Sequence, residues 1–128
     1  MEEYYENLDK IFSEASSIYD KKILSNFINV NIRASERSIR VKHAKTGIKV
    51  LEIGCGTGEE AGRFILETGN EIACLDVSDG MVNIARNKME KLGISDKFTS
   101  VKRPASEIGS IGDCFDLIYS FNGRLIIF

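Results

Sequence analysis

The sequence predicts an α/β fold with a doubly wound parallel sheet, and two features of the chain carry this prediction. From residue 48 onward, short apolar segments alternate with longer segments in which apolar residues recur at every third or fourth position. The first apolar segment leads directly into a turn with glycine at positions 54, 56 and 58, and a helix-forming segment follows. Strands that alternate with helices need right-handed crossovers, and these produce a parallel sheet whose faces are covered by helices.

The first third of the chain predicts helices alone. A first helix has an apolar face at helical spacing, which consists of Tyr4, Tyr5, Leu8, Ile11, Phe12 and Ala15. We expect a second helix to begin with Asp20 as its N-cap and to extend, with or without a break, to His43. Gly47 then ends the helical part. Residues 1–46 are therefore a predicted N-terminal helical cap, and residues 47–128 form the second part. We expect the two parts to form a single structural domain.

Four strands and two helices are predicted after residue 47. The strands are expected at residues 49–53, 71–76, 98–101 and 115–120. A helix over residues 59–68 should end at Gly69, where a left-handed glycine closes the last turn. The next helix should begin at Ser78 or Asp79 and end at Gly93. The residues expected to face inward are Ala61, Phe64 and Ile65 in the first helix and Met81, Ile84, Ala85, Met89 and Leu92 in the second.

Composition restricts the chain to one domain and argues against several classes of partner. Its 128 residues carry a net charge of −2 and are 43% hydrophobic, which suits a packed core and gives no attraction to nucleic acid or anionic membranes. The chain has no apolar run of about eighteen residues, and its acidic start lacks the basic region of a signal peptide. We therefore expect a cytoplasmic protein. A mild basic excess over residues 33–49 is expected to form a solvated helix face, with an RNA contact as the weaker alternative.

The cysteines and the single histidine predict no metal site. Cys55, Cys74 and Cys114 are widely spaced, and we expect small buried thiols in a reducing cytosol rather than a disulfide or a metal site. His43 is the only histidine, and it belongs to no Cys-x-x-Cys, Ser-His-Asp or Cys-His arrangement. We expect it to be exposed at a helix end.

The glycine turn and Asp76, which ends the second predicted strand, together predict a nucleotide pocket. Glycines let a ligand approach the backbone closely, and a carboxylate at this place can accept hydrogen bonds from both hydroxyls of a ribose. A dinucleotide site is disfavoured because Glu59 stands where the third glycine of that fingerprint would be, and its charge would repel a pyrophosphate. No lysine follows Gly58, which argues against a P-loop. The remaining ligand is a nucleoside with a zwitterionic or cationic tail.

Several segments resemble the class I S-adenosylmethionine-dependent methyltransferases. Residues 50–58, 75–81 and 115–120 are similar to the first, second and fourth motifs of that family, in the right order and at consistent separations. Residues 15–20 resemble the opening of its small-molecule branch. The resemblance is specific from about residue 49 to residue 122 and implies a Rossmann-like sheet, of which this chain holds the first four of seven strands.

The resemblance implies S-adenosylmethionine as the cofactor and a set of residues that bind it. The glycines would form the turn under its methionine part, Glu52 would support that turn and the amino group, and Asp76 would bind the ribose. Val77 would flank the adenine. The full implied set is Glu52, Gly54, Cys55, Gly56, Gly58, Asp76, Val77, Ala105 and Tyr19. No catalytic residue and no metal ligand is assigned.

The adenine end of this pocket departs from the family pattern. Many relatives carry an acid-alanine pair after the third strand, and the matching place in this chain is Pro104-Ala105. Ala105 would then offer its backbone N–H alone, unless Ser106 or Glu107 replaces the missing acid by a shift of register. Further pocket neighbours by family position, with simple packing as an equal alternative, are Tyr19, Tyr119 and Asn122.

The length of the chain is the second departure, and it predicts an exposed sheet edge. A fourth strand without its usual neighbour leaves unpaired backbone groups beside the apolar tail at residues 125–128. We expect a truncated product or fragment that forms a homodimer through strand four or this tail, with folding of the tail over its own edge as the alternative.

Three functions are compatible with these features, and two of them are favoured. The first is a methyltransferase that uses S-adenosylmethionine and acts on a small molecule, with no nucleic-acid or membrane partner. The second is a catalytically silent cofactor-binding or dimerisation remnant of such an enzyme. A nicotinamide oxidoreductase is the weakest reading because of Glu59. The methyl acceptor cannot be derived from the sequence.

Overall fold

The computed structural model describes residues 2–24, 27–43, 45–111, 114–120 and 125–127. These residues contain one sheet of five strands in the order β3-β2-β1-β4-β5. The first four strands are parallel, which confirms the predicted α/β class. The strands are β1 (Val50–Ile53), β2 (Ile72–Asp76), β3 (Phe98–Lys102), β4 (Leu117–Ser120) and β5 (Leu125–Ile127).

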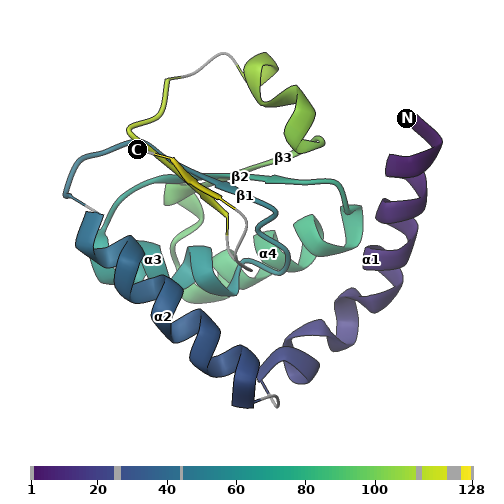
Figure 1. The fold of residues 1–128 in the computed structure, drawn as a ribbon, viewed down its shortest axis with the longest axis horizontal. Helices are drawn as coiled ribbons and strands as arrows, with labels where there is room; N and C mark the ends of the chain where they lie inside the picture. The colour runs from purple at the N-terminus through teal and green to yellow at the C-terminus, as the bar shows by residue number, and fades with distance from the viewer. Residues whose placement is uncertain (1, 25–26, 44, 112–113, 121–124, 128) are drawn as a thin grey trace.

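The helices are divided between the two sides of the sheet (Figure 1). The crossovers from β1 to β2 and from β2 to β3 run in one direction, so α3 and α4 cover the same face. The chain then returns past β2 and β1 to β4, and the 3-10 helix η2 lies on the opposite side. The helical elements are α1 (Glu2–Leu24), α2 (Phe27–His43), α3 (Glu59–Thr68), α4 (Asp79–Leu92), η1 (Ser95–Lys97) and η2 (Ala105–Ile111).

The core lies between the sheet and the helices α3 and α4. Its buried side chains are Val50, Ala61, Phe64, Ile65, Ile72, Met89, Leu117 and Tyr119. The predicted helix ends are confirmed: the Ser78 side chain accepts a hydrogen bond from the Met81 N–H, and Gly69 and Gly93 close the two helices in the left-handed conformation. Leu92, the last residue of α4, was expected to face inward but is 45% exposed.

The N-terminal helices differ from the prediction in two ways. Asp20 is not an N-cap, because α1 continues through it to Leu24. The expected apolar face of α1 is only partly right, since Tyr5, Leu8 and Ala15 are half-buried but Tyr4 and Ile11 are 61% and 59% exposed. The helix packs on the start of α4 through small residues: the Ser13 Oγ lies 2.9 Å from the Ser78 Oγ and accepts a hydrogen bond from the Gly80 N–H at 3.1 Å. Small residues allow the two backbones to approach more closely than large apolar side chains would.

The outer edge of β4 is occupied rather than open. The strand β5 pairs with it in an antiparallel register, with Ser120 opposite Leu125 and Ile118 opposite Ile127. The expectation of an exposed fourth strand is therefore wrong, and the alternative, a tail that folds back over this edge, is what the structure has. The backbone groups that would attract a second chain at β4 are already paired.

Gly80→Ala should weaken the attachment of α1 to α4. A Cβ atom at Gly80 would lie 2.8 Å from the Ser13 Cα and 2.9 Å from the Ser16 Oγ, so the helices would have to move apart. We expect a loss of about 1–3 kcal/mol in the free energy of unfolding, measured by urea denaturation.

Gly109→Ala is the matched control, because a Cβ atom at that position meets nothing within 4 Å. If Gly80→Ala were as stable as the wild-type chain and the control, the close contact between α1 and α4 would be contradicted.

Candidate functional site

The glycine turn between β1 and α3 is open on its outer side. Gly54, Gly56 and Gly58 all have positive φ angles, of 69°, 55° and 77°. At Gly58 a Cβ atom would also lie 3.0 Å from the Ala85 Cβ, so this glycine is needed for packing against α4 as well. At Gly54 and Gly56 a Cβ atom would meet nothing within 4 Å. A ligand can therefore reach the backbone at these two positions.

Asp76 ties this turn to the end of β2. One carboxylate oxygen accepts a hydrogen bond from the Gly56 N–H at 2.8 Å, and the other accepts one from the Ser78 N–H at 3.0 Å. Burial raises the pKa of Asp76, and these backbone N–H groups counteract part of that effect. A carboxylate has about four lone-pair sites, so two hydrogen bonds leave capacity for a ligand's hydroxyl groups.

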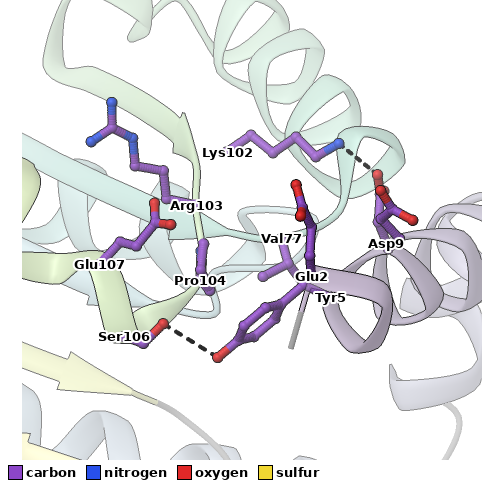
Figure 2. A pocket seen from close by; sticks show the side chains of 10 residues that line it. Glu2, Tyr5, Asp9, Val77, Lys102, Arg103, Pro104, Ser106 and Glu107 are labelled. Atoms are coloured by element: carbon purple, nitrogen blue, oxygen red, sulfur yellow. Dashed lines mark hydrogen bonds and ion pairs between the residues drawn. The ribbon is translucent and has the colours of Figure 1, made fainter.

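A cavity of about 430 Å³ begins directly after Asp76, at Val77. It lies between the N-terminal part of α1 and the segment that leaves β3, as Figure 2 shows. The Tyr5 hydroxyl lies 3.3 Å from the Ser106 Oγ, across its lower side in the view. Its lining residues are Glu2, Tyr5, Glu6, Asp9, Val77, Lys102, Arg103, Pro104, Ser106 and Glu107.

Lys102 attaches α1 to the rim of this cavity. Its ammonium group lies 2.6 Å from an Asp9 carboxylate oxygen and 2.9 Å from one of Asp79. Asp9 also accepts hydrogen bonds from the Ser13 hydroxyl and from the Asp79 N–H. The helix α1, the end of β3 and the start of α4 are thus connected at one point beside the cavity.

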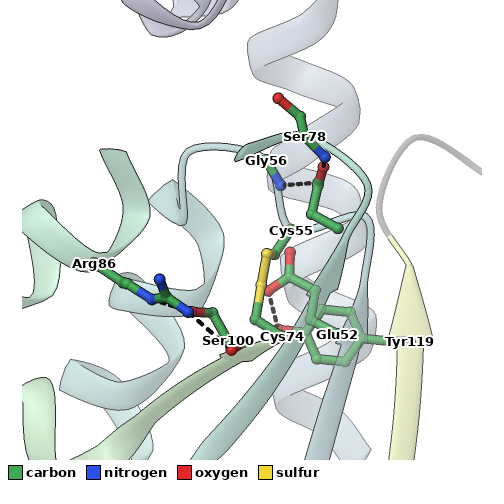
Figure 3. The surroundings of a disulfide bond; sticks show 9 residues. Glu52, Cys55, Gly56, Cys74, Ser78, Arg86, Ser100 and Tyr119 are labelled. Carbon is green, nitrogen blue, oxygen red and sulfur yellow. Dashed lines mark hydrogen bonds between the residues drawn. A yellow bond between two sulfur atoms is a disulfide. The ribbon is translucent and has the colours of Figure 1, made fainter. Parts of the chain in front are cut away.

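Below the turn lies a buried chain of polar groups, part of which appears in Figure 3. The Tyr119 hydroxyl on β4 donates to a Glu52 carboxylate oxygen at 3.1 Å, and Arg40 donates to the Tyr119 hydroxyl at 3.4 Å. Glu52 is 2% exposed. Burial raises the pKa of Glu52 to about 8, although the charge of Arg40 and the hydrogen bond from Tyr119 act in the opposite direction.

Three arginines of α2 point inward, which corrects the expectation of a solvated basic face. Arg33, Arg37 and Arg40 lie 3.6, 3.1 and 3.9 Å from the carboxylate of Glu60 on α3. Glu60 is 3% exposed, and a buried carboxylate needs cationic partners. The sequence spacing of three and four residues places these arginines on one side of the helix, but it does not say which side faces the protein.

The cysteines also differ from the expectation. The structure joins Cys55 and Cys74 in a disulfide, with Cα atoms 5.8 Å apart, where separate thiols had been expected. The turn brings Cys55 back over β2, whose residue Cys74 is the register partner of Glu52. Cys114 is free but exposed, whereas a buried thiol had been expected. His43 is exposed at the end of α2, as predicted. Within the described ranges, no group of His, Cys, Asp or Glu side chains is arranged to hold a metal ion.

The predicted site residues fall into three groups. The turn glycines, Cys55, Glu52, Asp76 and Val77 converge around the C-terminal ends of β1 and β2. Ala105 is exposed and does not line the cavity, whereas its neighbours Pro104 and Ser106 do. The side chain of Tyr19 and the whole of Asn122 lie outside the described residues. No local pattern pointed to Tyr5, Asp9 or Arg40 as site residues, because each reaches the site only through the packing of α1 or α2.

Glu59, which argued against a dinucleotide, is the first residue of α3. Its carboxylate lies 3.0 Å from the Lys88 ammonium and 3.5 Å from the Arg63 guanidinium. The beginning of the helix thus already carries an anion, in the place where a pyrophosphate would need free N–H groups and positive potential.

Comparison with known proteins agrees with this arrangement of turn, acid and sheet. A family model described as "Methyltransferase domain" matches residues 50–128. The chain belongs to this family. An uncharacterised protein of Methanocaldococcus jannaschii is 40% identical to it over 91 residues, which cover 71% of this chain and 30% of that protein. The ubiquinone/menaquinone biosynthesis C-methyltransferase UbiE of a Shewanella species is 27% identical over 112 residues, covering 84% of this chain and 44% of the enzyme.

Solved structures share the fold of this methyltransferase domain. A putative rRNA methylase from Clostridium thermocellum superimposes with a TM-score of 0.62 at 17% identity, over 75% of this chain and 57% of that one. A methyltransferase from Geobacter sulfurreducens in complex with S-adenosyl-L-homocysteine superimposes with a TM-score of 0.50 at 25% identity, over 59% of this chain and 29% of that one. The chain spans less than half of the length of the curated relatives described above.

Glu52→Gln should remove a pH-dependent loss of stability from the ligand-free domain. The pKa of Glu52 is about 8 in the folded protein, against an ordinary value of 4.5. Between these values the folded state holds a proton that the unfolded state has released, so the stability of the wild-type chain falls as the pH rises. Between about pH 5 and about pH 8, the free energy of unfolding of the wild-type chain should fall by on the order of a few kcal/mol relative to that of Glu52→Gln, measured by urea unfolding.

Glu71→Gln is the control, since Glu71 is exposed just before β2. Parallel pH profiles for the wild-type chain and Glu52→Gln would show that Glu52 is ionised in the folded protein and would contradict the expectation.

Proposed function

We propose that this chain binds S-adenosylmethionine and forms the cofactor-binding half of a methyltransferase that acts on a small molecule. The observation that supports this most directly is the carboxylate of Asp76, which is held by the Gly56 and Ser78 N–H groups beside an open glycine turn. An acid fixed in this way is oriented before the ligand arrives, so a ribose can bind without reorganisation of the turn.

Each part of the cofactor has a chemically suitable partner in this proposal. The two ribose hydroxyls would donate to Asp76, and the methionine part would pass over Gly54 and Gly56, where no side chain occupies the space. Val77 lines the cavity that would take the adenine. Glu52 would balance the charge of the amino group, and Cys55 would contribute as part of the turn.

The adenine amino group needs an acceptor that the usual acid does not supply. Ser106 and Glu107 both line the cavity, so we propose that one of them accepts this hydrogen bond in place of the missing acid. A contact with the Ala105 N–H and closure by Tyr19 also remain proposals. When bound, the cofactor supplies a methyl group on a positively charged sulfur, and the residues of the chain bind and orient it.

The relatives support a small-molecule acceptor. UbiE is named a ubiquinone/menaquinone biosynthesis C-methyltransferase, and a sterol 24-C-methyltransferase of Gibberella zeae is 33% identical over 81 residues, 63% of this chain and 21% of that enzyme. The acceptor itself is not assigned, and neither is a catalytic residue. None of the described helices combines the length and the apolar character needed to cross a membrane.

One observation favours the second candidate, a cofactor-binding remnant without transferase activity. The antiparallel strand β5 occupies the edge of β4 where a further parallel strand would otherwise pair. We propose in addition that residues 1–46 act as a cap on residues 47–128, and that any homodimer forms through the outer edge of β5. Truncation and a cytoplasmic location stay predictions.

Titration with S-adenosylhomocysteine by calorimetry tests the cofactor site, with NAD as the negative control. The wild-type chain should bind the adenosyl ligand, and Asp76→Ala should weaken binding about tenfold to a hundredfold because it removes the acceptor of two hydroxyl hydrogen bonds. Asp96→Ala, at an exposed acid of η1 before β3, should leave the affinity unchanged.

Thermal melts would confirm that each variant is folded. Equal affinity of Asp76→Ala and the wild-type chain would contradict the proposal, and so would a folded wild-type chain that binds no adenosyl ligand. Binding without turnover against a panel of acceptors would favour the remnant over the enzyme.

A further inference from the structure

We propose that Tyr119 and Arg40 are positioning residues that hold the Glu52 carboxylate in place for the amino group at the amino-acid end of the cofactor. This inference rests on the proposed function, because it takes S-adenosylmethionine or its product as the ligand. It assigns a role to two residues that lie on elements outside the glycine turn, and neither needs to touch the cofactor.

The geometry leads from α2 to the turn in two steps. The Arg40 guanidinium donates to the Tyr119 hydroxyl at 3.4 Å, and the same hydroxyl donates to Glu52 at 3.1 Å. Glu52 and Tyr119 are register partners on the adjacent parallel strands β1 and β4, so their side chains lie on the same face of the sheet. Glu52 stands two residues before Gly54, directly at the entry to the turn.

Arg40 is held in place by several contacts in addition to its hydrogen bond to Tyr119. It donates to the Glu60 backbone oxygen at 3.0 Å, and its guanidinium lies over the rings of Phe64 and Tyr119 at 5.0 and 5.6 Å. It is 1% exposed. A side chain with so little freedom can orient its neighbour, because it does not have to be ordered when the ligand binds.

Glu52 should release a proton when a cationic group of the ligand arrives. Burial raises the pKa of Glu52 to about 8, so in the ligand-free protein it holds its proton near neutral pH. An arriving ammonium group favours the carboxylate, and the proton then leaves Glu52 for the solvent. The groups that face Glu52 are Arg33 and Arg40 from α2, Glu60 from α3, Tyr119 from β4 and Cys74, in its disulfide, from β2.

Binding of two ligands, one with and one without the amino-acid end, distinguishes a positioning role of Tyr119 from general packing. S-adenosylhomocysteine carries the amino group, and 5′-methylthioadenosine keeps the adenosine and the sulfur but lacks the amino-acid end. Tyr119→Phe removes the hydroxyl while keeping the ring that packs on Phe64. It should weaken binding of S-adenosylhomocysteine about five- to tenfold and leave 5′-methylthioadenosine within about twofold.

A double-mutant cycle shows whether Tyr119 acts through Glu52. In the Glu52→Gln background, Tyr119→Phe should cause little further loss for S-adenosylhomocysteine. Arg40→Lys keeps the charge but loses the planar group that reaches the hydroxyl, so it should give a smaller loss in the same direction. Calorimetry in buffers of different ionisation enthalpy should show proton release with S-adenosylhomocysteine at neutral pH and none with 5′-methylthioadenosine.

Several outcomes would overturn the inference. If Tyr119→Phe lowered the affinity for both ligands equally, the role of Tyr119 would be purely structural. If it lowered neither affinity, Tyr119 would have no role in binding. If Asp76→Ala weakens both ligands while Tyr119→Phe changes neither, the proposed function stands and this inference is wrong. If the folded wild-type chain binds neither ligand, both are wrong.

Discussion

The carboxylate of Asp76 is the point on which the arrangement of the site depends. A turn in which several residues have positive φ angles directs backbone N–H groups inward, where they need an acceptor. Asp76 accepts from Gly56 on one side and from Ser78 on the other. The turn after β1, the end of β2 and the start of α4 therefore share one anchor, and the side chain of Ser78 is free to cap α4.

Polar contacts attach both N-terminal helices to the rest of the described chain. Lys102 connects α1 to the end of β3 through Asp9, and the inward arginines of α2 converge on Glu60 of α3. Buried ion pairs give little net stability relative to apolar packing. The loss of one partner is nevertheless strongly destabilising, because it leaves an unpaired buried charge. This mode of attachment explains how α1 can leave Tyr4 and Ile11 exposed.

The central part of the chain could be predicted because each of its boundaries has a local physical cause. The Ser78 cap, the left-handed Gly69 and Gly93 and the alternation of strands with helices act over a few residues, and they determine the elements between residues 48 and 120. The candidate residues at the turn were found for the same reason. The direction of α1, the burial of the α2 arginines, the disulfide and the pairing of β5 have no such local signal.

The α/β class, the glycine turn and the acid that ends β2 follow from local sequence, because backbone conformation and hydrogen-bond capping depend on residues close together in the chain. Three features depend on the packing of the folded chain: the inward face of each N-terminal helix, the pairing of Cys55 with Cys74, and the contact of Arg40 with Glu52 through Tyr119. These contacts join segments far apart in the sequence. Periodicity marks the two sides of a helix, but the available partners determine which side is buried.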